Sequence, residues 1–218
     1  MGLRERKKEQ TRRLLADTAR RLFSEHGFDR VTVAEIARAA EVSEATVFNY
    51  FPVKEDLFFS GLEVFADGLL QAVADRPTGE PLIGAVQAYV LRSAGLLERA
   101  GHGDTESLAR LRTVQRVIAD SAALQVREQR SFTEIAASLA RLIADESAGT
   151  EADHVAAEAV AAALLGVHRA LVDLVRRRVL ADDRLVSLAT DVRTFGEHAF
   201  ARLAEGLHNY APKPAEHA

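Results

Sequence analysis

A short run of polar and aromatic side chains stands between Glu44 and Tyr50. If this segment is helical, one side of it presents the residues Glu44, Ala45, Thr46, Asn49 and Tyr50. Hydroxyl and amide groups of this size reach base edges in the major groove of DNA, where an aromatic ring can touch a thymine methyl group or a phosphate. The pattern therefore indicates a recognition helix for double-stranded DNA.

Basic residues are concentrated at the start of the chain, although the formal net charge of the whole chain is -4. The first 13 residues hold two acidic residues, Glu5 and Glu9, and six basic ones: Arg4, Arg6, Lys7, Lys8, Arg12 and Arg13. Nucleic-acid binding depends on local positive charge more than on the net charge of a chain. The segment is either a solvated terminus or a phosphate-binding arm. The predicted recognition helix in the same chain favours the arm. Arg4, Lys7 and Lys8 would then contact DNA phosphates.

The sequence lacks the motifs of common enzymes and metal sites. It contains no cysteine, which excludes disulfides, thiolate metal sites and cysteine nucleophiles. A glycine-rich phosphate loop, a G-x-S-x-G elbow and a paired-histidine motif are also missing. His154 and Glu158 could hold a metal ion with help from Asp153, but a polar helix exterior explains them better. We predict no enzymatic activity, no catalytic residues, no metal and no cofactor.

Helix start signals divide the head of the chain into three helices. Apolar residues at helical spacing predict an amphipathic helix over about 5–25. Thr32, with a glutamate three residues later, has the pattern of a capping box and predicts a helix over 33–40. Ser43 can cap the third helix, over 44–50, before a proline stops it.

The apolar residues of these helices can form one small core. Those expected to point inward are Ile36, Ala37, Val42, Val47 and Phe51, packed against Leu22 and Phe23 of the first helix. The sequence thus predicts a compact three-helix head, 1–53, whose third helix keeps its polar side outside. A packing element that does not touch DNA is the alternative, but it leaves the basic arm unexplained.

Helices are also predicted through the rest of the chain, so the fold class is all-α with about nine helices. The expected ranges are about 54–75, 82–99, 104–118, 121–147, 151–179 and 183–207, with breaks at Gly101–Gly103 and Gly149. A second capping-box pattern at Ser131 leaves open whether 121–147 is one kinked helix or two. The tail, 209–218, contains two prolines and is expected to be disordered.

Residues 27–57 closely resemble the DNA-binding head of the TetR family. The features that carry the resemblance occur in one order: a glycine-aromatic pair at Gly27, T-x-x-E-I-A from Thr32, S-x-x-T-x-F-x-Y-F from Ser43, and P-x-K-E-x-L from Pro52. The rest of the chain is similar to the family only in being helical and of the expected length. The resemblance implies a helix-turn-helix domain, 1–53, joined to a helical ligand-binding and dimerisation domain, 54–208.

The resemblance also implies roles for individual residues. Thr46 and Asn49 match base-edge or phosphate contacts, Tyr50 matches an aromatic contact, and Lys54 matches a lysine that grips a phosphate. Thr32 would place helix-terminal amides near another phosphate. The predicted DNA-contact set is Arg4, Lys7, Lys8, Thr32, Glu44, Ala45, Thr46, Phe48, Asn49, Tyr50 and Lys54.

Two residues of the recognition helix depart from the family pattern. Phe48 stands where many members have tyrosine, so the hydroxyl that would bind a phosphate is missing. Glu44 is unfavourable close to phosphate, although it could accept a hydrogen bond from a cytosine amino group. Both departures leave the sequence of the bound DNA open.

Specific binding by one small recognition helix calls for a dimer, which spaces two such helices by roughly 34 Å or a multiple of it. The last two long helices carry apolar stripes that could form the dimer surface: Ala152, Ala156, Ala159, Val160, Ala163, Leu164 and Val167, then Leu185, Leu188, Val192, Phe195, Ala199 and Leu203. An intramolecular core would show the same pattern. The resemblance favours a homodimer built from a four-helix bundle.

The resemblance further implies a small, mostly hydrophobic effector that binds between helices of the second domain. Apolar stripes cannot separate such a pocket from an ordinary core. Polar residues within apolar helices are the better candidates, namely Tyr89, Arg112, Gln115, His168 and Arg169. A side chain that is solvated or satisfied in the core is the alternative for each of them.

The predicted function is a ligand-responsive transcriptional regulator, a repressor, that binds a pseudo-palindromic DNA operator. The longest apolar run, Ala159–Val167, is far short of the roughly 20 residues that span a bilayer. No signal peptide pattern is present, so we expect a cytoplasmic protein without a membrane partner. The alternatives are a helical enzyme or ligand carrier with a structural head, and a DNA-architectural dimer that senses no ligand.

Overall fold

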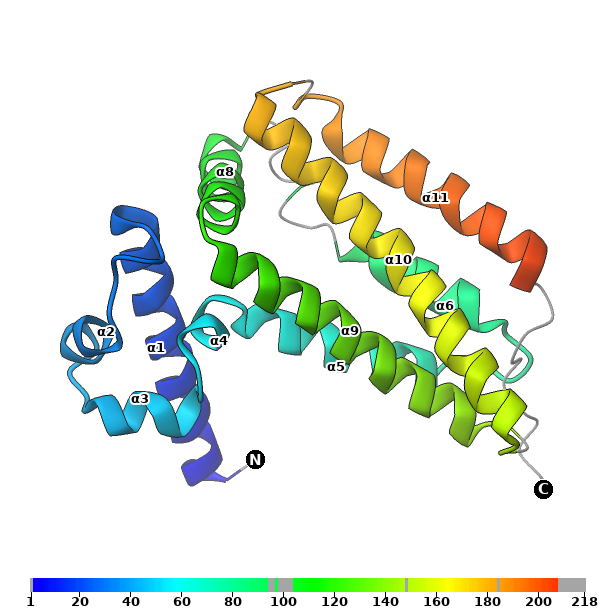
Figure 1. Ribbon diagram of the computed structural model, residues 1–218, viewed down its shortest axis with the longest axis horizontal. Helices are drawn as coiled ribbons and strands as arrows, with labels where there is room; N and C mark the ends of the chain where they lie inside the picture. The colour runs from blue at the N-terminus through cyan, green and yellow to red at the C-terminus, as the bar shows by residue number, and fades with distance from the viewer. Residues whose placement is uncertain (1, 94–96, 98–103, 148, 184, 208–218) are drawn as a thin grey trace. The chain divides into compact units, whose positions relative to one another are not determined.

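The computed structural model describes residues 2–93, 97, 104–147, 149–183 and 185–207. Within these ranges the chain forms ten α-helices, which confirms the all-α class (Figure 1). The helices are α1 (Leu3–His26), α2 (Val33–Ala39), α3 (Glu44–Tyr50), α4 (Lys54–Phe58), α5 (Ser60–Ala74), α6 (Leu82–Arg92), α8 (Thr105–Ala119), α9 (Ala122–Asp145), α10 (Glu151–Ala181) and α11 (Leu188–Leu207).

The chain divides into two compact units, and each unit combines two separate stretches of sequence. The first contains Met1–Val64 and Thr113–Glu128. The second contains Phe65–Arg112 and Gln129–Ala218. The predicted boundary after residue 53 therefore falls inside the first unit, which also takes in α4, the start of α5 and the residues around the α8–α9 junction.

Helix boundaries in the first unit follow the local signals in the sequence. The Glu35 N–H donates to Thr32 Oγ1 at 3.2 Å, and the Thr32 N–H donates to Glu35 Oε2 at 2.7 Å, which completes the capping box of α2. The Thr46 N–H donates to Ser43 Oγ at 3.1 Å at the start of α3. Gly27 ends α1 with a φ of 83°, where a glycine has no Cβ to clash. These caps confirm the predicted boundaries.

The turn between α2 and α3 holds Glu41 in the left-handed region, with a φ of 56°. The turn is closed by a hydrogen bond from the Val42 N–H to the Ala37 carbonyl at 2.9 Å. A left-handed conformation is unfavourable for a residue with a Cβ. The helix-turn-helix geometry is therefore maintained by the surrounding core against a local backbone cost.

The core of the first unit contains the predicted inward set. Ile36, Ala37, Val47, Phe51 and Phe23 are buried, and Val42 and Leu22 pack partly buried against them. Val117, Ile118 and Leu124, from around the α8–α9 junction, belong to the same core. This last group was not expected from the sequence, because the predicted head ended at residue 53.

Two of the predicted helix ranges are wrong. The expected helix over 54–75 is broken at Phe59 into α4 and α5. The apolar stripe continues across the break, but Phe59 is itself buried and its ring packs edge-on against Phe58, with centroids 5.2 Å apart. The helix expected from 183 starts only at Leu188, because Asp182 takes a left-handed φ of 52° that ends α10 and a turn follows.

The open question about 121–147 is resolved in favour of one helix. α9 runs without interruption through Ser131, and the Thr133 hydroxyl donates to the Gln129 carbonyl at 3.1 Å. Such a bond is typical of a helix interior and not of a cap. The end of the expected helix over 82–99 lies mostly outside the described residues, as do the Gly101–Gly103 break and the tail.

The second unit is built around α10, which packs along α11 and beside α6. Leu139, Leu164 and Phe200 are fully buried in this core. Within the described ranges, α10 is the one helix whose length and composition would allow it to cross a membrane, and 33% of its apolar window is buried inside the structure. The core helix of a soluble protein meets the same criterion.

Candidate nucleic-acid interface

Helix α3 presents one buried side and one exposed side. Val47 is buried completely in the head. The exposed residues are Glu44, Ala45, Phe48 and Asn49, while Thr46 and Tyr50 are half-buried at the edges. The side chains proposed to read DNA thus lie on the accessible face, as the helical spacing predicted.

Phe48 gives this face an apolar centre. Its side chain is 47% exposed, although a phenylalanine gains free energy from burial. An exposed ring on a recognition helix can contact a thymine methyl group, but it cannot donate a hydrogen bond to a phosphate. Phe48 therefore stays a predicted apolar contact and not a predicted phosphate contact.

Arg12 holds the C-terminal end of α3 in place. Its Nη1 donates to the Tyr50 carbonyl at 2.9 Å, and its guanidinium carbon lies 4.5 Å from the centre of the Phe51 ring. Its Nη2 also forms an ion pair with Glu63 of α5. One side chain of α1 therefore connects the recognition helix to α5, within the first unit. From the sequence alone, Arg12 was only one of the basic residues of the arm.

Lys54 is engaged with the head itself. Its Nζ donates to the carbonyls of Phe28 at 3.0 Å and Val31 at 3.1 Å, and it lies 4.1 Å from the centre of the Phe28 ring. An ammonium group has three N–H donors, so these two bonds leave one for a phosphate. The predicted phosphate contact is thus compatible with a second role, which is to fix the α1–α2 loop to α4.

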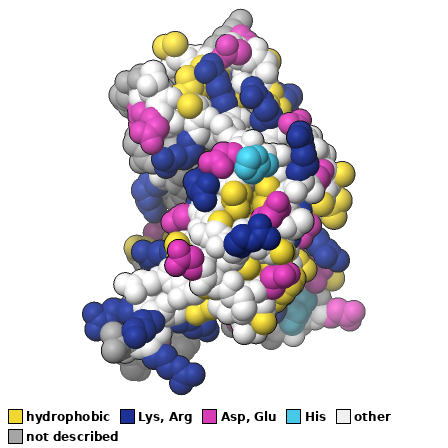
Figure 2. Space-filling model, turned by 90° about the vertical axis from the view of Figure 1, so that its left-hand side faces the viewer, with side chains coloured by type: hydrophobic (Ala, Val, Ile, Leu, Met, Phe, Trp, Pro, Cys, Tyr) yellow, Lys and Arg dark blue, Asp and Glu magenta, His cyan; other side chains and the backbone are white. Residues whose placement is uncertain are grey.

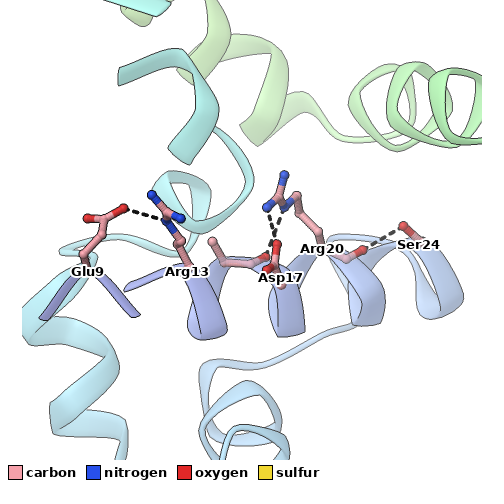
Figure 3. A network of polar contacts seen from close by, with 6 residues as sticks. Glu9, Arg13, Asp17, Arg20 and Ser24 are labelled. Atoms are coloured by element: carbon pink, nitrogen blue, oxygen red, sulfur yellow. Dashed lines mark hydrogen bonds and ion pairs between the residues drawn. The ribbon is translucent and has the colours of Figure 1, made fainter. Parts of the chain in front are cut away.

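The cations of α1 fall into two groups. Toward the middle of the helix, Arg13 Nε pairs with Glu9 at 2.9 Å and Arg20 pairs with Asp17 (Figure 3). Nearer the start of α1, four exposed cations have no ion-pair partner among the described residues: Arg4, Arg6, Lys7 and Lys8. Figure 2 shows Lys and Arg side chains gathered at the lower end, where α1 begins in Figure 1. This end of α1 offers unneutralised positive charge to a phosphate backbone.

Thr32 lies exposed at the start of α2, where its hydroxyl and N–H both bind the Glu35 carboxylate. These hydrogen bonds from Thr32 hold the pKa of Glu35 below its ordinary value. Glu35 is therefore ionised at neutral pH. The predicted approach of a phosphate to Thr32 would meet this negative charge, which is a cost that such a contact must overcome.

The first unit also includes residues that sequence reasoning did not connect with the head. The Ser121 hydroxyl donates to Asp29 at 2.8 Å, and Arg127 Nε donates to Asp56 of α4 at 2.9 Å. Leu124, which lies between Ser121 and Arg127 in the sequence, is fully buried. Because the partners are 71 and 92 residues apart in the chain, no local pattern could have revealed them.

The five residues predicted to contact a ligand are divided between the two units. Tyr89 and His168 lie in the second unit, each packed against Phe65, with ring centroids 5.3 and 4.5 Å away, respectively. Arg112 forms an ion pair with Asp182 near the end of α10. Gln115 is buried in the first unit, and Arg169 is exposed on α10. Tyr89 and His168 therefore share Phe65 as a neighbour.

Two of the α10 side chains that were weighed as metal ligands and rejected have structural partners. Asp153 completes the capping box with Thr150, and His154 Nδ1 lies 2.8 Å from the Thr150 carbonyl. Among the residues that the structure describes, no three His, Asp or Glu side chains gather as a metal site.

Residues 15–60, which include α2, α3 and α4, match the family model described as bacterial regulatory proteins, tetR family. The chain belongs to the TetR family. The matched range contains the capping box of α2, the whole recognition helix and Lys54. The TetR family is a class of transcriptional regulators and not a class of enzymes.

Individual relatives are also described as transcriptional regulators. The HTH-type transcriptional regulator TcmR of Streptomyces glaucescens is 32% identical over 145 residues, which are 66% of this chain and 63% of TcmR. The uncharacterized HTH-type transcriptional regulator Mb1581 of Mycobacterium bovis is 42% identical over 66 residues, 30% of this chain and 31% of that protein. The chain thus aligns with less than two thirds of the length of these TetR-family relatives.

A solved structure shows that the similarity in fold extends beyond the head. NalD of Pseudomonas aeruginosa, described as the secondary repressor of the MexAB-OprM multidrug efflux pump, matches with a TM-score of 0.51. The match covers 88% of this chain and 96% of NalD, at 21% sequence identity. At this identity the comparison supports the TetR fold alone.

Proposed function

We propose that this TetR-family protein is a ligand-responsive repressor in the cytoplasm, where it binds a pseudo-palindromic DNA operator as a homodimer. The observation that carries the proposal is α3, whose polar side is accessible while its C-terminal end is anchored through Arg12. Positioned donors and acceptors on a held helix are what base recognition requires. A small, mostly hydrophobic effector would release the operator.

The proposed dimer surface is the outward side of α10 together with α11. Part of the predicted stripe is used inside the subunit, because Val160, Leu164, Leu188 and Val192 are buried in the second unit. Other apolar or small residues remain exposed along α10: Val155, Ala159, Ala162 and Gly166. Phe195 of α11 is also 44% exposed. Small side chains permit the close helix approach of a four-helix bundle.

The central experiment selects bound duplexes from a genomic library and measures affinity for the selected sequence against bulk competitor DNA. Asn49→Ala removes an exposed amide from α3, and Tyr50→Phe removes only a hydroxyl, so both leave the core of the head intact. We expect each variant to weaken specific binding by about tenfold, as loss of one base or phosphate contact would. Wild-type protein that prefers no duplex would overturn the proposed function.

Salt dependence tests the contribution of the basic arm. The double variant Lys7→Ala/Lys8→Ala should lower the slope of log affinity against log salt by about two per head, because each phosphate contact releases about 0.9 counterions. Arg20→Ala/Arg21→Ala is the matched control on the same helix, since these two cations already pair with acidic neighbours. Equal slopes for the two double variants would contradict a phosphate-binding arm.

Ala162→Arg tests the dimer surface, because it places a long charged side chain on the exposed side of α10. We expect a monomer in sedimentation and loss of operator binding with unchanged helical content. Ala181→Arg is the control, because Ala181 is exposed at the end of α10 and is not among the residues named for the proposed dimer surface. A variant that remains dimeric would place the interface elsewhere.

A further inference from the structure

Four aromatic side chains, one of them His168, pack together in the second unit. The Phe65 and His168 rings stack with centroids 4.5 Å apart and an interplanar angle of 24°. Phe132 contacts the imidazole edge-on at 5.4 Å, and Tyr89 packs on the Phe65 ring at 5.3 Å. We refer to Phe65, Tyr89, Phe132 and His168 as the aromatic cluster. It joins α5, α6, α9 and α10.

The cluster contains a hydrogen-bonding group that the protein does not use. His168 keeps some exposed surface, but its Nδ1 is buried and has no hydrogen-bond partner among the described residues. Buried polar atoms are nearly always paired, and an unpaired one lowers stability. Burial also lowers the pKa of His168 to about 4, so the ring is neutral at neutral pH. A neutral Nδ1 can form one hydrogen bond with a bound molecule.

Tyr89 supplies a second polar group beside the same ring. A Cβ at Gly68 would collide with the Tyr89 hydroxyl, so the absence of a side chain there lets the tyrosine lie against α5. Within the described part of the chain the Tyr89 hydroxyl has no hydrogen-bond partner, and it is not a buried atom, so it stays accessible. The cluster thus combines flat apolar faces with two unused polar groups, which is the chemistry of a small-molecule site.

We propose that the aromatic cluster binds an uncharged, hydroxylated aromatic compound, whose hydroxyl group forms a hydrogen bond with His168 Nδ1. This inference rests on the proposed function, because it names the chemical class of the effector. A hydroxyl group both donates and accepts, so it matches either tautomer of the neutral imidazole. An anionic ligand is disfavoured, because the negative faces of the surrounding rings offer no compensation for its lost hydration. Flat rings of a ligand can stack on the phenylalanines.

Helix α5 connects the cluster to the head along the chain. Phe65 follows Glu63 by two residues on α5, and Glu63 holds the arginine that anchors α3. A ligand that moves Phe65 therefore acts on the helix that also carries this ion pair. Phe65 and Glu63 thus belong to one helix, although they lie in different units of the chain.

The test compares 1-naphthol with 1-methylnaphthalene, two probes of similar shape of which only the first has a hydroxyl group. Binding is measured by calorimetry at neutral pH on the full-length protein. We expect the wild type to bind 1-naphthol about tenfold more tightly, the effect of one buried hydrogen bond. His168→Phe keeps the ring and removes the nitrogen, so it should abolish the preference.

His154→Phe is the matched control, because His154 is exposed on the same helix. It lines a separate groove of about 420 Å³ between α9 and α10, where an apolar probe could also collect. This variant should keep the wild-type preference for 1-naphthol. If His154→Phe loses the preference, or His168→Phe keeps it, the proposed site is wrong.

Nitrogen-15 spectra of the wild type make the test independent of how the variants fold. 1-Naphthol should shift the His168 Nδ1 resonance, and 1-methylnaphthalene should not. No preference and no shift in the wild type would overturn the effector class. Duplex binding by the same sample separates the effector hypothesis from the repressor hypothesis. If operator binding is retained, the repressor proposal stands. If operator binding is absent, the result counts against the repressor proposal alone.

Discussion

Replacement of Arg12 by methionine gives the sharpest test of how the recognition helix is held. The substitution removes the hydrogen bond to the Tyr50 carbonyl at 2.9 Å and the contact with the Phe51 ring. A charge-assisted hydrogen bond contributes about 1.5 kcal/mol, and a partly exposed cation–π contact adds about 0.5 kcal/mol. The ion pair with Glu63 adds little, because that carboxylate side chain is 53% exposed. The free energy of unfolding should fall by about 2 kcal/mol.

Urea unfolding measures the stability of the variant, and fluorescence anisotropy measures its affinity for operator and for random duplex. Specific affinity should fall more than non-specific affinity, because Arg12 positions α3 and its guanidinium is already bonded within the first unit. Arg12→Lys keeps the charge but cannot reproduce the planar contacts, so it should recover less than half of either loss. Arg13→Met is the control, since that side chain is 75% exposed and pairs only with Glu9.

Two results would refute this reasoning. Full recovery by Arg12→Lys would show that Arg12 acts as a simple point charge. An unchanged ratio of specific to non-specific affinity in Arg12→Met would show that the end of α3 is positioned by other contacts.

Three further predictions concern single residues. Glu41→Gly should raise the free energy of unfolding by about 1 kcal/mol in urea titrations, because glycine tolerates the φ of 56°; Glu41→Ala, which keeps a Cβ, should give no such gain. His168 has a pKa of about 4 when folded, against 6.5 without burial, so its unfolded form takes up a proton first as the pH falls. The wild type should therefore lose up to about 3 kcal/mol of stability between pH 6.5 and pH 4 relative to His168→Gln, and parallel pH profiles would contradict this burial. Thr32→Ala removes the hydroxyl hydrogen bond to Glu35 but keeps the backbone N–H bond, which is the larger cause of the shift, so the pKa of Glu35 should rise only part of the way toward its ordinary value in an NMR titration; Thr32→Ser should leave it low.

The parts of the head that the sequence predicted are those set by local signals. The capping box at Thr32, the cap at Ser43 and the exposed side of α3 each depend on residues within a few positions of one another. The helix break at Phe59 was missed, because the apolar stripe continues through it and tertiary packing decides the outcome. The contacts of Arg12 and Lys54 were missed for a related reason: charge alone does not show which distant carbonyl a side chain will reach.

The discontinuous make-up of the first unit matters for anyone who exchanges heads among TetR-family proteins. A fragment cut after Val64 would leave out Val117, Ile118 and Leu124, which fill the same core as Phe23 and Phe51. A chimera that transplants only the N-terminal segment would therefore carry a gap where these side chains belong. Grafting 113–128 together with 1–64 would transfer a complete hydrophobic interior and with it the native shape of the DNA-reading surface.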